Sequence, residues 1–449
     1  MGENTSAILE TSRALVPKLG VLSSLLIPIK LSFTYISVIP TMILFAITLR
    51  DEVLRWYKAY RSISLPLIAF LFVLFYSSLF GINIGNSMIN AAKLSFMVGL
   101  IPLYFYLGTK GNSQSILLLL TVGSLVASTH TIVEGAYPND IGSFSHGPVS
   151  EAGQLGIALF VSLALLFSLQ IHRKKDLLID ILQSGTVPFF AFTLLGFAYK
   201  LSLNAWATGI LTTVCGAYLL AHATQLFLSL RGEPTGKNAY SFLTSTALPL
   251  LAASLIVNLK RGPWIGVTTG LAILLLITRP KLLLIIIPFV IGLIFGFDPI
   301  RERAFSSLEH FFMVGGRSEI WALGGELLAR YPLGIGLENA LVIRDFSYDI
   351  PANLNHFHSN IINIAVELGW LGIAAYLWWM GSVFYEGLRG SSRQTRDLVT
   401  ITLTCGLISW QVAGLFEYNF GDSEVFIFAM MVMGVLISRL PVTSSNPKI

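Results

Sequence analysis

Long apolar runs separated by short polar segments dominate the pattern of residues along this chain. A helix needs about 20 mostly apolar residues to cross the hydrocarbon core of a bilayer, and many of the runs approach that length. The strands of a membrane β-barrel would alternate in polarity over about ten residues, whereas these runs are continuous. The pattern therefore predicts an all-α polytopic membrane protein with about 12–14 transmembrane helices.

The first apolar stretch has two possible structures. It runs from Leu19 to Leu49 and contains Lys30 and Pro40, so it predicts either one span preceded by an interfacial helix or a tight hairpin of two helices. The runs that we interpret as spans lie at residues 31–49, 64–81, 89–107, 114–133, 152–171, 180–199, 206–229, 241–258, 264–278, 282–297, 361–383, 398–415 and 424–439.

Lysine and arginine concentrate in alternate loops between these runs, with Lys200 as an exception. Cytoplasmic loops of membrane proteins carry an excess of these cations. The alternation therefore places residues 134–151, 259–263 and 298–358 on the far side of the membrane. The cation-rich segments are 50–63, 172–175, 231–237, 279–281 and 389–396, and the loops without lysine or arginine include 82–88, 134–151 and 416–423.

The longest far-side loop, 298–358, separates an N-terminal bundle of spans, 1–297, from a C-terminal group, 359–449. This long loop breaks the charge pattern, because it holds arginines and no lysine. Guanidinium groups suit planar, bidentate binding of phosphate or carboxylate. The long loop therefore predicts an anion site, with ion pairing to its own acidic residues as the alternative. Its arginines are Arg301, Arg303, Arg317, Arg330 and Arg344.

Part of the long loop is predicted to be helical. Apolar residues recur on neighbouring helical turns between Ser318 and Tyr331, which is typical of an amphipathic helix. Pro332, Gly334 and Gly336 follow, and they predict a turn that ends this helix. The apolar positions are Ile320, Trp321, Leu323, Leu327 and Leu328.

Two far-side segments place an arginine beside a predicted helix N-terminus. Lys260, Arg261 and Trp264 surround Pro263, a residue suited to the first turn of a helix. Arg317 follows two glycines and opens the amphipathic helix of the long loop. Each arginine could hold an anion at the membrane surface, and the alternative for Arg261 is a snorkelling anchor.

A third far-side segment, from His356 to Asn360, precedes the span at 361–383. Ser359 or Asn360 is suited to the N-cap of that helix. A helix N-terminus attracts an anion and favours a neutral imidazole at His358, which could accept a proton or donate to phosphate. The alternative is an interfacial polar residue.

Metal binding is a further alternative for His356 and His358, although no convincing third ligand lies nearby in the sequence. Asp422 and Glu424 form a closely spaced acidic pair that could bind a divalent ion. We expect neither a metal nor another cofactor.

Composition narrows the class of protein. Hydrophobic residues make up 54% of the chain and charged residues 12%, whereas an ordinary soluble domain carries about 25% charged residues. This excludes a soluble globular enzyme and a disordered chain. The net charge of +5 reflects cations in cytoplasmic loops, so we expect no nucleic-acid partner. The two cysteines lie in apolar runs and predict neither a disulfide scaffold nor a zinc ribbon.

Arg261, Arg317 and His358 lie on separate segments, yet the predicted topology puts them on one membrane face. A cationic cluster at the lipid boundary suits a lipid-linked diphosphate that carries sugars, because the arginines neutralise the charge of the leaving group. Further candidates for substrate contact are Lys260, Trp264, Trp321, Tyr331 and Asn360. An interfacial aromatic belt is the alternative for the tryptophans and the tyrosine.

The stretch from about Ile256 to Gly372 resembles the O-antigen ligase and polymerase superfamily of bacterial envelope glycosyltransferases. Four motifs occur in the order of that superfamily. They are a basic segment before an aromatic residue (Lys260-Arg261-Gly262-Pro263-Trp264), an arginine four residues before a tryptophan (Arg317 and Trp321), a Pro-x-Gly-x-Gly turn (Pro332, Gly334 and Gly336), and a histidine followed by Glu and two glycines (His358, Glu367, Gly369 and Gly372). Ser359 stands where many members have Asn, and Lys260 replaces the common Ser.

The resemblance implies an inverting, metal-independent glycosyltransferase with a large helical fold of the GT-C kind. It implies a multi-pass protein of the bacterial inner membrane, embedded in membrane lipids, with an active site that faces the periplasm. The donor would be a polysaccharide on undecaprenyl diphosphate, and the acceptor of a ligase would be lipid A–core oligosaccharide. Arg261 and Arg317 would hold the diphosphate, and His358 would activate the acceptor hydroxyl or steady the donor phosphate.

Other functions remain open from the sequence. The polymerase branch joins one undecaprenyl-linked repeat to another, and the protein O-oligosaccharyltransferase branch usually has a longer C-terminal portion. A secondary transporter or lipid flippase would place ionisable groups near the bilayer midplane. Lys93 and Glu367 are the only charges clearly inside predicted spans, and each lies within about two turns of a far-side end. This placement favours chemistry at the membrane surface.

Overall fold

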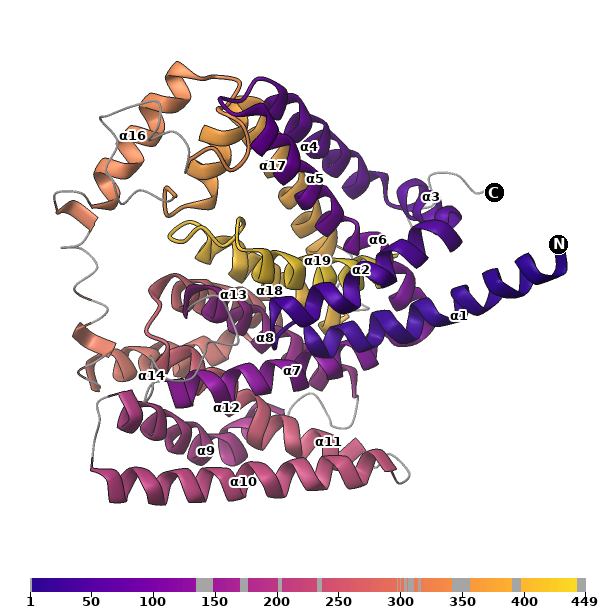
Figure 1. Ribbon diagram of the computed structural model, residues 1–449. Helices are drawn as coiled ribbons and strands as arrows, with labels where there is room; N and C mark the ends of the chain where they lie inside the picture. Colours follow the sequence, from indigo (N-terminus) through magenta and orange to yellow (C-terminus); the bar gives the residue numbers. More distant parts are fainter. Residues whose placement is uncertain are drawn as a thin grey trace.

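The computed structural model describes residues 2–134, 148–169, 177–200, 204–231, 236–296, 298, 300–302, 305, 311–313, 316–340, 356–389 and 397–441. These residues form helices and turns, with no strand among them. Figure 1 shows long helices packed side by side, with α16 at one end of the bundle. The prediction of an all-α polytopic membrane protein is confirmed.

The first apolar stretch forms two helices. Helices α1 (Gly2–Leu26) and α2 (Leu31–Thr48) are joined by a turn and pack against each other. Arg13 Nε donates to the carbonyl oxygen of Thr48 at 3.0 Å, which ties α1 to the end of α2. Of the two, α2 is among the segments long and apolar enough to cross a membrane and α1 is not, so whether α1 crosses the membrane or lies at its surface stays a prediction.

The other predicted spans also coincide with helices. These are α4 (Arg61–Leu79), α5 (Ile84–Val98), α6 (Leu100–Leu107), α7 (Ser113–Glu134), α8 (Pro148–Ser168), α9 (Leu177–Lys200), α10 (Ala205–Arg231), α12 (Leu248–Val257), α13 (Arg261–Thr278), α14 (Leu283–Gly296), α17 (Asn360–Arg389), α18 (Leu398–Ala413) and α19 (Ser423–Ser438). Shorter elements are α3 (Arg50–Ala59), η1 (Gly108–Asn112), α11 (Gly236–Phe242), η2 (Leu243–Ala247), η3 (Pro280–Leu282) and α16 (Arg317–Arg330).

Eight helical segments in the described part of the chain are long and apolar enough to cross a membrane, and four apolar helices are shorter. The longest segment, Ile84–Val133, has 50 residues. A straight helix of that length would extend about 75 Å, far beyond a hydrocarbon core of about 30 Å. The segment bends at η1, where Gly111 has a φ of 84°. The total of about 12–14 crossings stays a prediction.

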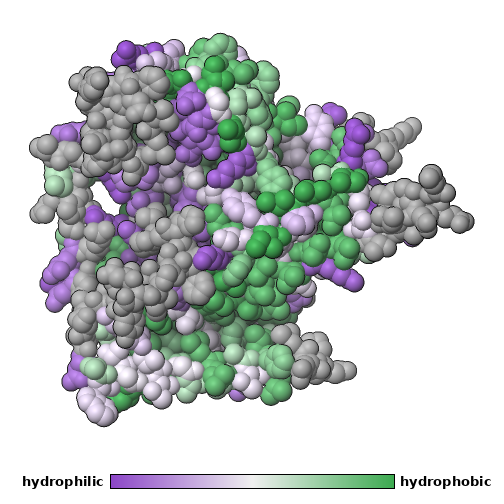
Figure 2. All heavy atoms as spheres, in the orientation of Figure 1, coloured by the Kyte–Doolittle hydropathy of each residue, from purple (hydrophilic) through white to green (hydrophobic). Residues whose placement is uncertain are grey.

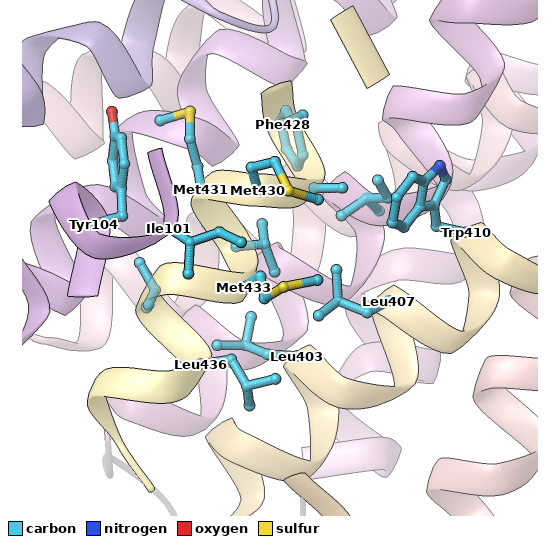
Figure 3. Close-up of a cluster of buried hydrophobic side chains, with 14 of the residues drawn as sticks. Ile101, Tyr104, Leu403, Leu407, Trp410, Phe428, Met430, Met431, Met433 and Leu436 are labelled. Carbon is cyan, nitrogen blue, oxygen red and sulfur yellow. The ribbon is translucent and has the colours of Figure 1, made fainter. Parts of the chain in front are cut away.

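Helix α19 forms the centre of the bundle. Its residues from Val425 to Ile437 are almost completely buried, and it packs against α6, α8 and α18. A helix that is apolar all round belongs in a protein core. Figure 3 shows Met430, Met431 and Met433 of α19 among side chains from α6 and α18. Helix α19 therefore provides a fixed support for the loop that precedes it.

Three glycines bring α13 close to α18. Gly262, Gly266 and Gly270 lie four residues apart on one face of α13. A Cβ atom on Gly266 would come within 2.3 Å of the carbonyl oxygen of Ser409, and one on Gly270 within 2.7 Å of that of Cys405. Small residues with this spacing allow close helix packing in membranes. The N-terminus of α13 is thereby fixed against the end of α18.

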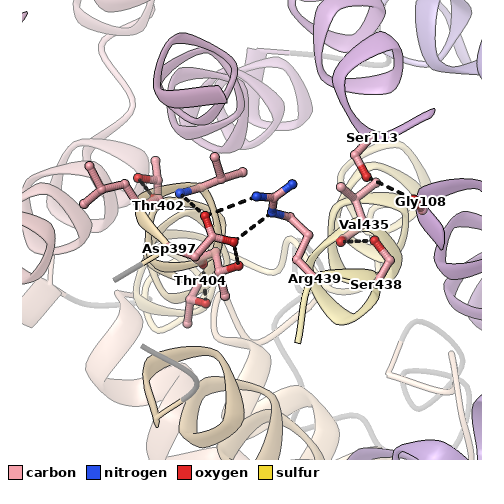
Figure 4. Close-up of polar contacts among 11 residues, drawn as sticks. Gly108, Ser113, Asp397, Thr402, Thr404, Val435, Ser438 and Arg439 are labelled. Atoms are coloured by element: carbon pink, nitrogen blue, oxygen red, sulfur yellow. Dashed lines mark hydrogen bonds and ion pairs between the residues drawn. The ribbon is translucent and has the colours of Figure 1, made fainter. Parts of the chain in front are cut away.

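An ion pair joins α18 and α19 at their other ends. Arg439 donates to the carboxylate of Asp397 from Nε at 3.0 Å and from Nη2 at 3.2 Å, as Figure 4 shows. Asp397 also accepts the backbone N–H of Val399 at 3.1 Å, so it caps α18. The two antiparallel helices are thus fixed at one end by this pair and connected at the other by the loop 414–422.

Apolar side chains also cover much of the outside. Ile36, Phe72 and Trp206 are 72%, 70% and 83% exposed, and Figure 2 shows broad hydrophobic areas on the visible face. A soluble protein of this size rarely exposes so much contiguous apolar surface. These faces suit contact with lipid.

Candidate active site

Helix α16 is the predicted amphipathic helix of the long loop. It buries Ile320 and Leu327 in a small apolar cluster that includes Phe357. Trp321 Nε1 donates to the carbonyl oxygen of Phe357 at 2.9 Å. These contacts fix the N-terminus of α16, where Arg317 lies, beside the segment that carries His358.

Hydrogen bonds hold the backbone just before α17. The N–H of Phe357 donates to Asn363 Oδ1 at 2.7 Å. The N–H of Asn360 donates to the carbonyl oxygen of Gly414 at 2.6 Å. Because α17 begins at Asn360, Ser359 occupies the position before its first turn, as predicted. The histidine segment is therefore fixed both to α17 and to the loop 414–422.

His358 has a left-handed backbone conformation, with a φ of 50°. Its N–H donates to Nδ1 of His356 at 3.1 Å, and the centroids of the two rings lie 4.2 Å apart at a near-perpendicular angle. A positive φ is uncommon outside glycine, although histidine adopts it more readily than most residues. Such strain is frequent at functional sites.

The imidazole of His358 is neutral near pH 7. Burial lowers its pKa to about 4, with further contributions from the neighbouring His356 and from the positive charge of Arg317. Burial and Arg317 also lower the pKa of His356. A neutral imidazole can accept a proton, which a protonated one cannot. Arg317 is close enough to act on both histidines, so the structure brings Arg317 and His358 together.

Arg317 pairs with an acid that the sequence analysis missed. Its Nη2 lies 3.4 Å from Oε1 of Glu417, and the two side chains are 32% and 12% exposed. Glu417 belongs to the loop 414–422, which the sequence analysis noted for its lack of lysine and arginine and for Asp422. An acid in a loop without cations was the available signal for Glu417.

Arg261 lies next to a residue that contacts the same acid. It begins α13 and is half-buried. A Cβ atom on the following Gly262 would come within 2.7 Å of Cγ of Glu417. The N-termini of α13 and α16 therefore meet at Glu417. A direct role for the Arg261 side chain stays a prediction.

The predicted aromatic contacts have internal partners. Trp264 Nε1 donates to the carbonyl oxygen of Leu255 at 2.8 Å, and Trp321 supports Phe357 as described above. Tyr331 packs against the same apolar cluster as Trp321, with the guanidinium of Arg330 5.5 Å from its ring centroid. These three rings support the site, and sugar contact by them stays a prediction. Lys260 lies just before α13 in extended backbone.

Asn360 is almost completely buried and uses both ends of its amide internally. Its Nδ2 donates to Oδ1 of Asn419 at 2.7 Å, and its Oδ1 accepts the N–H of Phe420 at 2.9 Å. This residue therefore ties α17 to the loop 414–422. Its observed contacts belong to the framework of the site, not to a surface open to substrate.

The Pro-x-Gly-x-Gly turn docks into a break in α17. Gly369 has a φ of 72° inside that helix. The N–H of Gly336 donates to the carbonyl oxygen of Glu367 at 2.9 Å, and that of Trp370 donates to Pro332 at 3.1 Å. A Cβ atom on Gly334 would lie 2.3 Å from the Glu367 carbonyl oxygen. The last two sequence motifs thus form one structural unit.

A polar cluster lies behind the two histidines. The hydroxyl of Tyr418 donates to Oε2 of the buried Glu367 at 3.5 Å, and the Tyr418 ring centroid is 5.6 Å from that of His356. Burial raises the pKa of Tyr418, and the charges of Glu367 and Glu338 raise it further. Burial also raises the pKa of Glu338, an effect opposed by Lys93. Lys93 and Glu367, the two charged residues clearly inside predicted spans, therefore lie near the site.

The other arginines of the long loop are placed differently. Arg301 pairs with Asp298 at 2.6 Å, an acid of the same loop that the ion-pair alternative had not named. Arg303, Arg344 and Gly315 lie outside the described residues.

The residues proposed as metal ligands have other contacts. Asp422 Oδ1 accepts the N–H of Glu424 at 3.1 Å and so caps α19. Within the described ranges, no group of three or more His, Cys, Asp or Glu side chains is arranged to hold a metal ion.

The site lies largely in a segment that matches a known family. Residues 246–377 match the family model described as O-antigen ligase, and this segment contains Arg261, Arg317, the docked turn and His358. No curated protein matches the chain. The resemblance of this stretch to the O-antigen ligase superfamily is confirmed over residues 246–377 of the chain.

Proposed function

We propose that the protein is an O-antigen ligase, an inverting, metal-independent glycosyltransferase. It would move O-antigen polysaccharide from undecaprenyl diphosphate to lipid A–core oligosaccharide at the periplasmic face of the bacterial inner membrane. The family match over residues 246–377 supports this class of reaction. The observation that carries the proposal is a strained, neutral His358 beside Arg317 within that segment.

The acceptor hydroxyl oxygen attacks the anomeric carbon of the donor sugar. A new C–O bond forms, the bond from that carbon to the diphosphate oxygen breaks, and the configuration inverts. His358 takes the hydroxyl proton on its neutral ring, and undecaprenyl diphosphate leaves as the anion. A positioned base of this kind contributes about 10²–10⁴ in rate.

Arg317 stabilises the negative charge that develops on the leaving diphosphate, and Arg261 acts with it from the start of α13. Cations placed where charge develops stabilise the transition state more than the ground state. Glu417 partly neutralises Arg317 before the donor binds. The diphosphate then competes with Glu417 for this guanidinium.

Binding of the donor also changes the pKa of His358, the proposed base. The charge of Arg317 helps to lower the pKa of His358, and a bound diphosphate opposes that charge. The pKa of His358 therefore rises on donor binding, toward the range in which an imidazole removes a proton effectively.

The test is transfer by purified protein in vesicles that hold an undecaprenyl-diphosphate polysaccharide. Lipid A–core is supplied in one arm and omitted in the other. We expect sugar-bearing lipid A–core in the first arm and no longer chains in the second. Growth of donor chains without lipid A–core would instead identify a polymerase, and the absence of both products from folded protein would refute a transferase.

A further inference from the structure

His356 makes a local contact that the reaction above does not use. Its Nδ1 accepts the backbone N–H of His358, two residues later, at 3.1 Å. An Asn or Asp side chain that accepts from the N–H two residues on forms an Asx-turn. In this segment the ring nitrogen of His356 takes the place of the Asn side-chain oxygen and accepts the same hydrogen bond.

This contact requires an imidazole that is unprotonated on Nδ1. Burial and the nearby charge of Arg317 lower the pKa of His356, so its ring is neutral near pH 7. The acceptor is therefore present under the conditions in which His358 would act.

The neighbours of His356 fix its ring. The Tyr418 ring lies at 5.6 Å, tilted by 36°, and the His358 ring lies at 4.2 Å on a near-perpendicular plane. Tyr418 is held in turn by its hydrogen bond to Glu367. The ring is thus set between a buried tyrosine and the proposed base.

The backbone of His358 needs such a support. Its φ of 50° is in the left-handed region, which is disfavoured for residues other than glycine. The neighbouring bonds of Phe357 and Asn360 hold the segment on either side, and the bond to His356 holds the N–H of the strained residue itself.

We propose that His356 is a positioning residue, whose Nδ1 holds His358 in its left-handed conformation and so aims the His358 ring beside Arg317. This inference rests on the proposed function for its kinetic consequence. Its structural part concerns one hydrogen bond and is measurable without substrate.

The test compares His356→Asn with His356→Phe. Asparagine keeps an acceptor for the N–H two residues on, whereas phenylalanine keeps the aromatic packing on Tyr418 and loses the acceptor. A displaced catalytic group loses about 10–100-fold in rate. We expect this loss in kcat for His356→Phe, an unchanged KM for donor, and near wild-type kcat for His356→Asn. His222→Phe on α10 is the matched control and retains wild-type kinetics.

Amide hydrogen exchange of the 356–360 segment is the second measurement. We expect one more fast-exchanging amide in His356→Phe than in the wild type or in His356→Asn. Equal protection in all three proteins, or equal kcat in the wild type and His356→Phe, overturns the inference. Absence of transfer by the wild type would refute the proposed function, while the exchange comparison would still decide whether His356 holds His358.

Discussion

Gly262 lies against Glu417, since a Cβ atom on this glycine would come within 2.7 Å of the Glu417 Cγ. Glu417 also pairs with Arg317 at 3.4 Å. The first turn of α13 and the first turn of α16 therefore meet at one carboxylate, although their sequences are more than fifty residues apart. The close packing of α13 on α18 makes this meeting possible.

Gly266→Ala tests that packing away from the charged groups. Its Cβ atom would lie 2.3 Å from the backbone oxygen of Ser409, so α13 must shift from α18. We expect a loss of about 1–3 kcal/mol in stability, measured as a lower thermal midpoint in detergent. Gly209→Ala is the control, because nothing lies within 4 Å of its Cβ position. Equal midpoints for wild type and Gly266→Ala would contradict the close contact.

Glu417→Gln should strengthen anion binding. The change removes the negative charge that pairs with Arg317, so an added phosphate group no longer competes with a carboxylate. A partly exposed pair of this kind is worth about 0.5–1 kcal/mol, so we expect roughly a 2–5-fold lower Kd for inorganic pyrophosphate. Calorimetry on purified protein measures this. Glu417→Asp retains the charge as a control, and weaker binding by Glu417→Gln would argue against competition at Arg317.

Arg317→Ala and His358→Ala should each abolish most transfer while the protein stays folded and inserted. Loss of one charge-stabilising donor typically costs about 10²–10³ in kcat, and loss of the base about 10²–10⁴. Lipopolysaccharide ladders from cells that carry only the variant provide the measurement. Arg55→Ala is the control, because Arg55 pairs with Glu52 three residues earlier on α3, away from the site. Ladders of wild-type length and intensity from either site variant would contradict the proposed roles.

The dependence of the rate on pH should follow the lowered pKa of His358. Its ordinary value is 6.5 and its value in the protein is about 4, so the neutral, active form persists as pH falls until about 4. We expect kcat/KM to stay high well below pH 6.5 and to decline as pH approaches about 4. Because bound diphosphate raises the His358 pKa, the acid limb of kcat should lie at higher pH. Profiles recorded from about pH 3.5 to 8 test this, and a kcat/KM limb at 6.5 would exclude it.

A chelator should leave turnover unchanged. In the proposed reaction Arg261 and Arg317 supply the positive charge for the diphosphate, and Asp422 serves as a helix cap. Initial rates with and without EDTA provide the comparison. A complete loss of activity that a divalent ion restores would revive a metal site at Asp422 and Glu424.

The sequence predicted features that depend on local pattern. Spans followed from long apolar runs, and α16 followed from helical periodicity between Ser318 and Tyr331. Pro332 and two glycines predicted the turn that ends α16. Such signals are carried by the residues that form each element, so they need no knowledge of tertiary contacts.

Contacts between segments far apart in the sequence could not be predicted from local patterns. The bond between the docked turn and α17 uses backbone groups, which every residue has, so no side-chain pattern announces it. The importance of Glu417 comes from Arg317, a residue 100 positions earlier. Asn360 suited a substrate contact by type, yet folding directs its amide to Asn419 and Phe420.

The break at Gly369 interrupts α17, and the turn at residues 332–336 binds to the backbone at that point. Backbone bonds there fix the end of α16 to α17 directly, and further bonds fix His358 to α17 and the loop 414–422. The proposed anion-binding arginine and the proposed base therefore share α17 as a common anchor. A shift of this helix would carry both groups with it and leave the spacing between them nearly unchanged.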